Sequence, residues 1–162
     1  MFSLAQLYTK PWFNKLPFIQ KELVSQSYYF LEDKNFDQST FYDYSFIVMP
    51  AAKAYEGFLK DLFYKQKLIT QERYKGNHFR VGKALNPELA HQHPDGFERL
   101  FDDMCRIYSP EIADLLWEAW KQSRNQIFHY FENGQQTINL YEAKRRLNLI
   151  CQAIEKVSEF KK

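Results

Sequence analysis

The sequence predicts an all-α protein, built as one bundle of four to five main helices. Apolar residues recur at helical spacing through five stretches of the chain. Only five glycines occur among 162 residues, and long stretches contain no proline, which favours helices over many short strands. Hydrophobic residues make up 45% of the chain, so residues 1–162 can form a single domain with a proper core.

The chain begins with an N-terminal arm, residues 1–15, followed by a first helix. The arm is rich in aromatic residues and is interrupted by Pro11. Pro17 can open the helix, because proline suits the first helical turn, and the helix should end near Asp33. The side chains expected to be buried in these two segments are Leu4, Leu7, Trp12, Phe13, Phe18, Leu23, Ser27, Phe30 and Leu31.

A second long helix should begin between Thr40 and Tyr44 and bury one apolar stripe. Pro50 conflicts with a regular helix, because proline removes one backbone hydrogen bond and kinks the chain. Two alternatives follow: the helix bends at Pro50, or it starts there and a separate turn precedes it. The stripe consists of Ile47, Ala51, Tyr55, Phe58, Leu59 and Leu62.

The connection at residues 65–95 is predicted to be irregular and basic. The net charge of the whole chain is only +2, so nucleic-acid binding would need a local cluster of cations such as this one. Aromatic residues interleave with the cations, which suits backbone tracking and base stacking, although a solvated loop that maintains solubility explains the pattern equally well. The cations are Lys65, Lys67, Arg73, Lys75, Arg80 and Lys83, and the aromatics are Tyr64, Tyr74 and Phe79.

Three further helices are expected after this connection. The first spans residues 97–108, and the second begins at Ser109-Pro110, where serine caps the helix and proline takes its first position. Asn133-Gly134 should end that second helix, because glycine favours the left-handed C-cap. The last helix spans residues 139–160 and carries a second basic cluster, Lys144, Arg145 and Arg146.

The residues with the clearest chemistry, Arg124 and His129, lie late in the helix that starts at Ser109-Pro110. Arginine is a permanent cation whose planar fork suits phosphate oxygens. Histidine can accept and donate a proton near neutral pH. Together these two side chains can cleave a phosphodiester without a metal ion.

The helical spacing predicts where this pair lies relative to the core. A straight helix would place Arg124 and His129 about 140° apart, on the side opposite the buried stripe. Large aromatics on an exposed face suggest a partner surface, and a second copy across a two-fold axis would complete a composite site. The expected stripe is Ile112, Leu115, Leu116, Ala119, Ser123, Ile127 and Tyr130, and the opposite side carries Trp117, Lys121, Asn125 and Phe128.

The segment Arg124-Asn125-x-x-x-His129, late in a long helix of a small helical domain, resembles the motif of the HEPN superfamily (higher eukaryotes and prokaryotes nucleotide-binding). Residues 42–60 resemble the earlier long helix of that family, which often carries an acidic residue near the motif, here Glu56. The combination is similar to the HEPN domain of RnlA/LsoA-type toxins and covers residues 40–160. Those toxins are longer, with N-terminal domains that this sequence lacks.

The resemblance implies a homodimeric, metal-independent endoribonuclease that cleaves RNA through the 2′-hydroxyl. Such proteins are usually the toxin of a toxin–antitoxin or phage-defence system, with an antitoxin protein as partner. It implies that Arg124 stabilises the scissile phosphate, that His129 transfers protons and that Glu56 assists them. The residues expected to bind RNA are Lys121, Asn125, Arg73, Lys75, Arg80 and Lys83.

Several alternatives remain open at this level. Glu56 is either an exposed acid paired with Lys60 or a partner of the motif residues. The whole motif face is either catalytic or a non-catalytic module that binds RNA or a partner protein. Some HEPN proteins are silenced by modification of a tyrosine two residues after the histidine, and Phe131 at that position argues against such control.

The remaining expectations concern metals, cofactors and compartment. His91 and His93 are spaced for a metal, but no set of carboxylate or cysteine ligands accompanies them, so we expect neither a metal nor a cofactor. Cys105 and Cys151 fall on core positions and are expected to be free thiols in a reducing cytoplasm. No secretory signal pattern and no run of about 18 apolar residues occurs, so no membrane association is expected.

Overall fold

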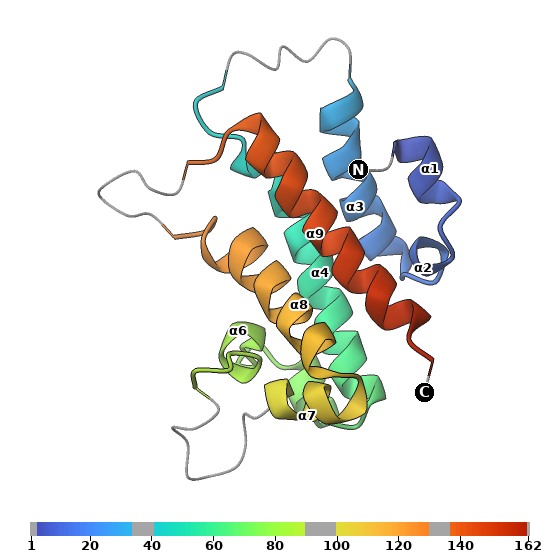
Figure 1. Cartoon of the computed structure of the whole chain (residues 1–162), viewed down its shortest axis with the longest axis vertical. Helices are drawn as coiled ribbons and strands as arrows, with labels where there is room; N and C mark the ends of the chain where they lie inside the picture. The colour runs from blue at the N-terminus through green and yellow to red at the C-terminus, as the bar shows by residue number, and fades with distance from the viewer. Residues whose placement is uncertain (1–2, 34–40, 90–99, 130–136, 162) are drawn as a thin grey trace.

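The computed structural model describes residues 3–33, 41–89, 100–129 and 137–161, and all regular structure in these residues is helical (Figure 1). The predicted all-α fold is therefore confirmed. The helices are α1 (Leu4–Tyr8), α2 (Pro11–Asn14), α3 (Phe18–Glu32), α4 (Ser45–Lys65), α5 (Gln71–Lys75), α6 (Val81–Ala84), α7 (Leu100–Ile107), α8 (Pro110–Trp120), the π-helical turn η1 (Lys121–Asn125) and α9 (Leu140–Glu159).

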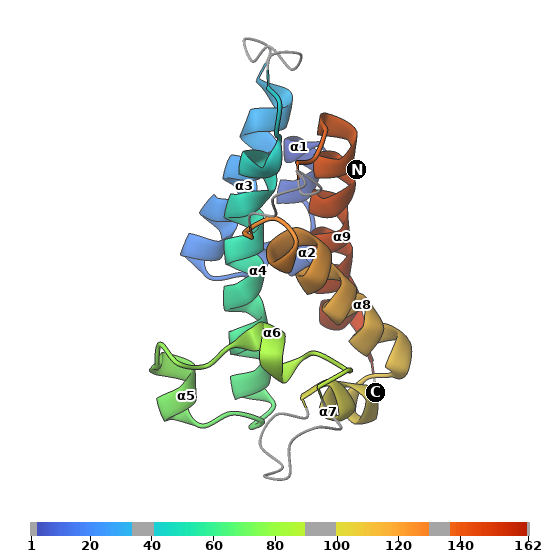
Figure 2. The ribbon, with the colours of Figure 1, turned by 90° about the vertical axis from the view of Figure 1, so that its left-hand side faces the viewer.

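Four helices, α3, α4, α8 and α9, form the body of the molecule. α4 packs against α3 on one side and α9 on the other, and α8 packs against α9. α4 and α9 run in one direction, while α3 and α8 run in the other (Figure 1). Figure 2 shows α5 and α6 beside the C-terminal half of α4, so the basic connection belongs to that end of the bundle.

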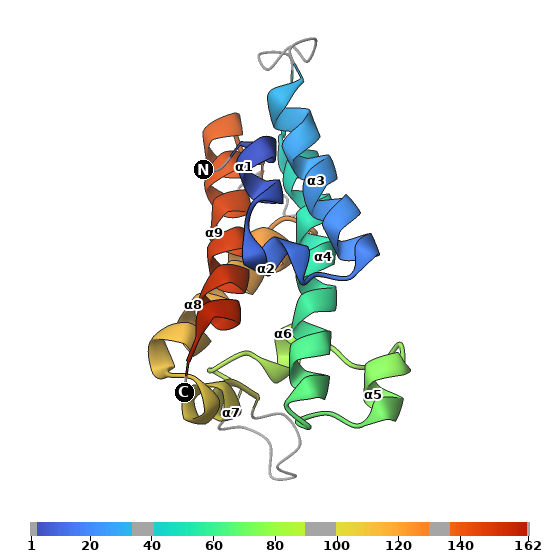
Figure 3. The same ribbon diagram turned by 90° about the vertical axis from the view of Figure 1, so that its right-hand side faces the viewer.

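The N-terminal arm packs on the body through two short helices. α1 contacts α3 and α2 contacts α9, as Figure 3 shows from the side. The predicted anchors Leu4, Leu7, Trp12 and Phe13 are all buried, which confirms the expected docking of the arm. Burial of large side chains of this kind is the main favourable contribution to the free energy of folding.

α3 begins one residue after Pro17, as predicted, but its buried face differs from the expected one. Ser27 and Leu31 are buried, whereas Phe18 is 75% exposed. Gln20, in the same turn of α3, is buried and donates to Asp61 of α4 at 2.8 Å, so Phe18 lies on a different side of this turn. Val24 and Tyr28 take its place on the buried face.

α4 continues through Pro50, so the helix begins before the proline and does not restart there. The backbone N–H of Ala51, which follows the proline, donates to the Ser27 hydroxyl of α3 at 3.1 Å. Ser27 is fully buried, so its hydroxyl would carry a desolvation penalty without a hydrogen-bond partner. The Ala51 N–H supplies that partner across the two helices. Of the predicted stripe, Ile47, Ala51, Tyr55, Leu59 and Leu62 are buried and Phe58 is partly buried.

Two predictions about local structure were wrong. The connection after Lys65 is not irregular throughout, because Thr70 caps α5 by accepting from the Arg73 N–H, and α6 follows. The helix from Pro110 does not reach Asn133: α8 ends at Trp120 and continues only as the π-helical turn η1. Phe97 and Asn133-Gly134 lie outside the described residues.

The π-helical turn has identifiable causes in the hydrogen bonds around it. The Gln126 N–H donates to the Lys121 carbonyl five residues earlier, at 3.0 Å. The buried Ser123 hydroxyl donates to the Ala119 carbonyl, and such back-bonding bends helices. Single π turns inside helices often occur at functional sites.

The last helix agrees with the sequence prediction. Asn139 caps α9 by accepting from the Glu142 N–H at 2.8 Å. Ala143, Leu147, Ile150 and Ile154 are completely buried against the body. No helix of the described residues is long and apolar enough to cross a membrane.

Candidate functional site around Arg124

Arg124 lies in η1 and faces α4, where it meets Glu56. The Arg124 Nε atom is 3.6 Å from Glu56 Oε2, and the two side chains are 34% and 35% exposed. This pairing selects between the two interpretations of Glu56, because its carboxylate faces the motif arginine. At this exposure the ion pair contributes little to stability, so its main effect is to orient the guanidinium.

Two aromatic rings hold the guanidinium from its own chain segment. The Arg124 Cζ atom is 4.8 Å from the centre of the Phe128 ring and 5.6 Å from that of Trp120. Trp120 is buried, whereas Phe128 is 39% exposed. Cation–π contacts of this kind fix a guanidinium while leaving its N–H donors available to an anion.

Trp120 is the residue of this site that the sequence analysis did not single out. Trp120 lies four residues before Arg124, and Phe128 lies four residues after it. Residues four apart are neighbours on a helix, so this spacing could have predicted both ring contacts of Arg124. The helical spacing predicted that Trp117 takes this aromatic role instead. Trp117 is only partly exposed and packs against the core, so the prediction that it shares the exposed motif face with Phe128 was wrong.

The predicted geometry of Arg124 and His129 also needs correction. The estimate of 140° assumed one straight helix, but the π-helical turn ends at Asn125 and irregular turns follow. His129 lies in that turn region with its side chain exposed. Asn125 is exposed as well, and Lys121 Nζ lies 4.0 Å from the Glu118 carboxylate. The motif residues therefore lie on a π-helical turn and on the irregular turns that follow it, so the angle expected for a straight helix does not apply.

A pocket of about 470 Å³ opens beside Arg124. This volume falls within the range of small-molecule sites. One wall comes from α3, one from α4 and one from the segment that carries Arg124. The lining residues are Leu23, Gln26, Met49, Pro50, Lys53, Glu56, Arg124 and Phe128, an apolar surface with four polar or charged groups.

The basic connection contacts this site through Gly82 of α6, which packs against Trp120. A Cβ atom at Gly82 of α6 would lie 2.5 Å from Trp120 Nε1, so only glycine allows this close approach. Arg80 and Lys83, on either side of Gly82, are exposed. The structure thus brings part of the predicted RNA-binding stretch next to the tryptophan that supports Arg124.

Substituting Gly82 with alanine tests this support. The added methyl group must displace the buried Trp120 ring, and such overpacking lowers the free energy of unfolding by about 1–3 kcal/mol. Gly57→Ala is the matched control, because its Cβ would meet only the flexible end of Gln20. Urea denaturation should show a clear loss for Gly82→Ala and a smaller change for Gly57→Ala; equal losses would contradict the role of Trp120.

The aromatic residues of the basic connection are mostly engaged in packing. Tyr64 and Tyr74 stack on each other with ring centres 4.7 Å apart, and Phe79 meets Phe63 edge-on. Tyr74 donates its hydroxyl to Asp61 at 2.6 Å. Tyr64, at 40% exposure, therefore offers the most accessible ring for stacking. Lys75 is exposed and Arg73 is half-buried.

Two arginines of the second basic cluster, Arg145 and Arg146, form ion pairs and hydrogen bonds within the protein. Arg145 and Arg146 both bond to the Glu142 carboxylate, at 2.7 Å each. The hydrogen bonds from Arg145, together with Arg146, lower the pKa of Glu142 to about 2. Arg146 also donates to the Gln122 carbonyl at 2.5 Å, and this hydrogen bond links η1 to α9.

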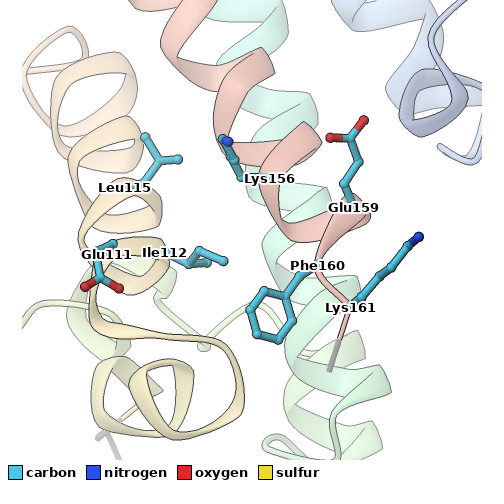
Figure 4. A pocket seen from close by; sticks show the side chains of 7 residues that line it. All are labelled: Glu111, Ile112, Leu115, Lys156, Glu159, Phe160 and Lys161. Atoms are coloured by element: carbon cyan, nitrogen blue, oxygen red, sulfur yellow. The ribbon is translucent and has the colours of Figure 1, made fainter.

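A larger pocket, about 530 Å³, lies between the start of α8 and the end of α9 (Figure 4). Ile112 points across it toward the Phe160 side, as the close view shows. It shares no lining residue with the pocket beside Arg124 and contains no arginine or histidine. Its lining is Glu111, Ile112, Leu115, Lys156, Glu159, Phe160 and Lys161.

The described residues offer neither a metal site nor a reactive buried thiol. Within the described ranges, no three His, Cys, Asp or Glu side chains form a group that could hold a metal ion. His91 and His93 lie outside those ranges. Cys105 and Cys151 are free, and burial raises the pKa of the Cys151 thiol to about 12, so that thiol is inert.

Comparison with protein-family models, curated proteins and solved structures gives no match to this chain.

Proposed function

We propose that the chain is a metal-independent endoribonuclease of the HEPN type that cleaves RNA through the 2′-hydroxyl. The observation that carries this proposal is the placement of Arg124. Its guanidinium is oriented by Glu56, Trp120 and Phe128 at the wall of a pocket, five residues before an exposed histidine.

The reaction needs one phosphate ligand and one proton carrier. The ribose 2′-oxygen attacks its own phosphorus, the bond to the 5′-oxygen breaks, and a 2′,3′-cyclic phosphate forms. His129 takes the proton from the 2′-hydroxyl or gives one to the leaving 5′-oxygen, and two copies of His129 in a dimer supply both roles. Arg124 donates hydrogen bonds to the phosphate oxygens as their charge increases.

Glu56 orients the arginine without occupying all its donors. A guanidinium has five N–H donors, and the contact to Glu56 involves Nε. The remaining donors can bind a phosphate in a bidentate manner. Lys121 and Asn125 extend the phosphate-binding surface, and single-stranded RNA is the favoured substrate because its bases can turn outward.

A second candidate function is a non-catalytic module that binds a partner protein. The exposed Met49 and Phe128, each 39% exposed at the pocket, favour it. In that case the pocket receives a side chain of the partner. In the nuclease proposal the same face serves an antitoxin protein, in a cytoplasmic toxin–antitoxin or phage-defence pair.

The test uses a labelled single-stranded RNA and a matched RNA with 2′-O-methyl groups throughout. The native RNA should be cleaved, with and without EDTA, to products ending in a 2′,3′-cyclic phosphate. The methylated RNA should stay intact, because it lacks the attacking hydroxyl. Cleavage of the methylated RNA, loss of activity in EDTA, or no cleavage of either RNA would overturn the proposal and favour the interaction module.

We expect a homodimer, because each protomer supplies one copy of the motif histidine, His129, and the reaction benefits from two. The exposed Phe128 beside the motif belongs at or near the contact, whereas Trp117 packs against the core. Light scattering at micromolar concentration should give about twice the monomer mass of 19.6 kDa. A mass of one chain that does not change on concentration would exclude the composite site.

The basic connection is expected to bind the RNA backbone. Neutralising Arg73, Lys75, Arg80 and Lys83 should weaken RNA binding and flatten its salt dependence. Each phosphate contact that is lost reduces the slope of log K against log salt by roughly 0.7 for a single strand. Binding measured over a series of salt concentrations checks this; an unchanged slope would assign these residues to solubility.

A further inference from the structure

The pocket beside Arg124 has a chemical character that a phosphate does not use. Its walls include the apolar side chains of Leu23, Met49 and Phe128. A flat, weakly polar group fits such walls better than an anion does. Of its polar lining residues, Gln26 comes from α3, whereas Lys53 and Glu56 lie about one helical turn apart on α4.

We propose that this pocket binds the base of the nucleotide whose phosphate lies on Arg124, and that it selects guanine. The inference rests on the proposed phosphate role of Arg124. The apolar walls contact the faces of the base, and Lys53 and Glu56 read its edge. An apolar pocket with a few placed polar groups is the usual form of a small-molecule site, and the volume of about 470 Å³ matches that class.

Guanine is favoured by the pairing of one carboxylate with one ammonium group. The Watson–Crick edge of guanine carries two adjacent donors, N1–H and the 2-amino group, and one acceptor, O6. A carboxylate has two oxygens with about four acceptor positions in total, so Glu56 can accept both donors while it keeps its contact to Arg124. The Lys53 ammonium group is a donor that suits O6.

The other three bases match this pair less well. Adenine presents one amino group beside a ring acceptor, which would face the carboxylate with a lone pair. Cytosine and uracil each present a single donor on this edge, so one carboxylate oxygen would lose its partner. A good bidentate pair discriminates between bases by roughly 5- to 150-fold in affinity.

The arrangement also gives Glu56 a second purpose. Binding of guanine to Glu56 holds the carboxylate that orients Arg124, so recognition of the base and positioning of the phosphate ligand use the same residue. A guanine-containing substrate would therefore be bound with its phosphate already in register.

The binding experiment uses the four nucleoside 3′-monophosphates and inosine 3′-monophosphate, with the His129→Ala protein measured by calorimetry. Inosine lacks only the 2-amino group and is the matched ligand control. Guanylate should bind roughly 5- to 150-fold tighter than the other three common nucleotides, and inosinate should lie between. Equal affinities for all five nucleotides would overturn the inference.

Two variants assign the preference to residues. Lys53→Met should reduce the ratio of guanylate to adenylate affinity, because it removes the donor to O6, which adenine lacks. Glu56→Gln should reduce the ratio of guanylate to inosinate affinity, because an amide has one acceptor oxygen instead of two. Lys60→Met, at a lysine of α4 outside the pocket lining, should leave both ratios unchanged. Thermal melts establish that each variant is folded. A preference for guanylate that survives both pocket variants would overturn the assignment.

An RNA arm separates this inference from the proposed nuclease activity. The wild-type protein is given single-stranded RNAs that contain one guanine or one inosine in an otherwise identical sequence. Cleavage next to guanine in preference to inosine supports both proposals. Cleavage without base preference overturns the guanine subsite alone. Tight guanylate binding without RNA cleavage overturns the nuclease and assigns the pocket to a free guanine nucleotide.

Discussion

The His129→Ala and Arg124→Ala variants are each expected to lose RNA cleavage almost completely. Removing a proton carrier reduces the rate roughly 10²- to 10⁴-fold, and removing a donor to the charge of the transition state reduces it about 10²- to 10³-fold. His129 is exposed and Arg124 is 34% exposed, so neither side chain belongs to the core and the folded state should persist. Initial rates with a labelled RNA and circular dichroism measure the two properties.

Arg124→Lys should recover little activity, because an ammonium group cannot form the bidentate contact of a guanidinium. Arg106→Ala is the matched control, since Arg106 is exposed and pairs with Asp103 of its own helix, α7. Glu56→Ala should be milder than Arg124→Ala if the carboxylate only orients the arginine. Full activity in His129→Ala, from a preparation purified in the same way as the wild type, would refute the assignment.

The Tyr55→Ala variant is expected to lose about 3–5 kcal/mol of unfolding free energy, as for other large aromatic side chains removed from a core. Tyr55 is completely buried between α4 and α8, and its hydroxyl donates to the Leu116 carbonyl at 3.0 Å. Burial raises the pKa of the Tyr55 phenol well above its usual value, so the hydroxyl remains a donor at any physiological pH. Urea denaturation measures the loss.

Tyr55→Phe separates the ring from the hydroxyl. It keeps the packing and removes one hydrogen bond, so the expected loss is about 0.5–1.5 kcal/mol. An equal loss in both variants would mean that the hydrogen bond between α4 and α8 dominates over the packing. Because Glu56 follows Tyr55 directly, the alanine variant should also misplace the partner of Arg124.

The helical stripes of α4 and α9 could be predicted from the sequence, because their apolar residues repeat with one period over a long stretch. Ile47, Ala51, Tyr55 and Leu59 are buried as that period requires. The prediction failed for Phe18, at the first turn of α3, where burial depends on which neighbour reaches it rather than on spacing. The cap at Asn139 is of a kind that residue type predicts, because asparagine is a preferred N-cap residue.

The site was predictable only in its charged members. Glu56 pairs with Arg124, which was one of the two interpretations of Glu56. This pairing was predictable because a carboxylate and a guanidinium carry opposite charges. The π-helical turn could not be predicted, because it depends on how a buried Ser123 bonds to Ala119 and on how Arg146 holds Gln122. The contact between Gly82 and Trp120 joins segments far apart in the chain and leaves no periodic signal.

The bond from the Ala51 N–H to the Ser27 hydroxyl has a consequence for the order of folding. A backbone donor of α4 next to Pro50 finds its partner on a different helix, so α4 alone cannot reach the hydrogen-bonded state that it has in the bundle. The two helices should therefore consolidate as one cooperative unit, and hydrogen exchange at Ala51 should report the opening of the α3–α4 pair rather than the fraying of one helix. Because Pro50 and Glu56 lie on the pocket side of this pair, the pocket beside Arg124 gains its shape only after that unit has formed.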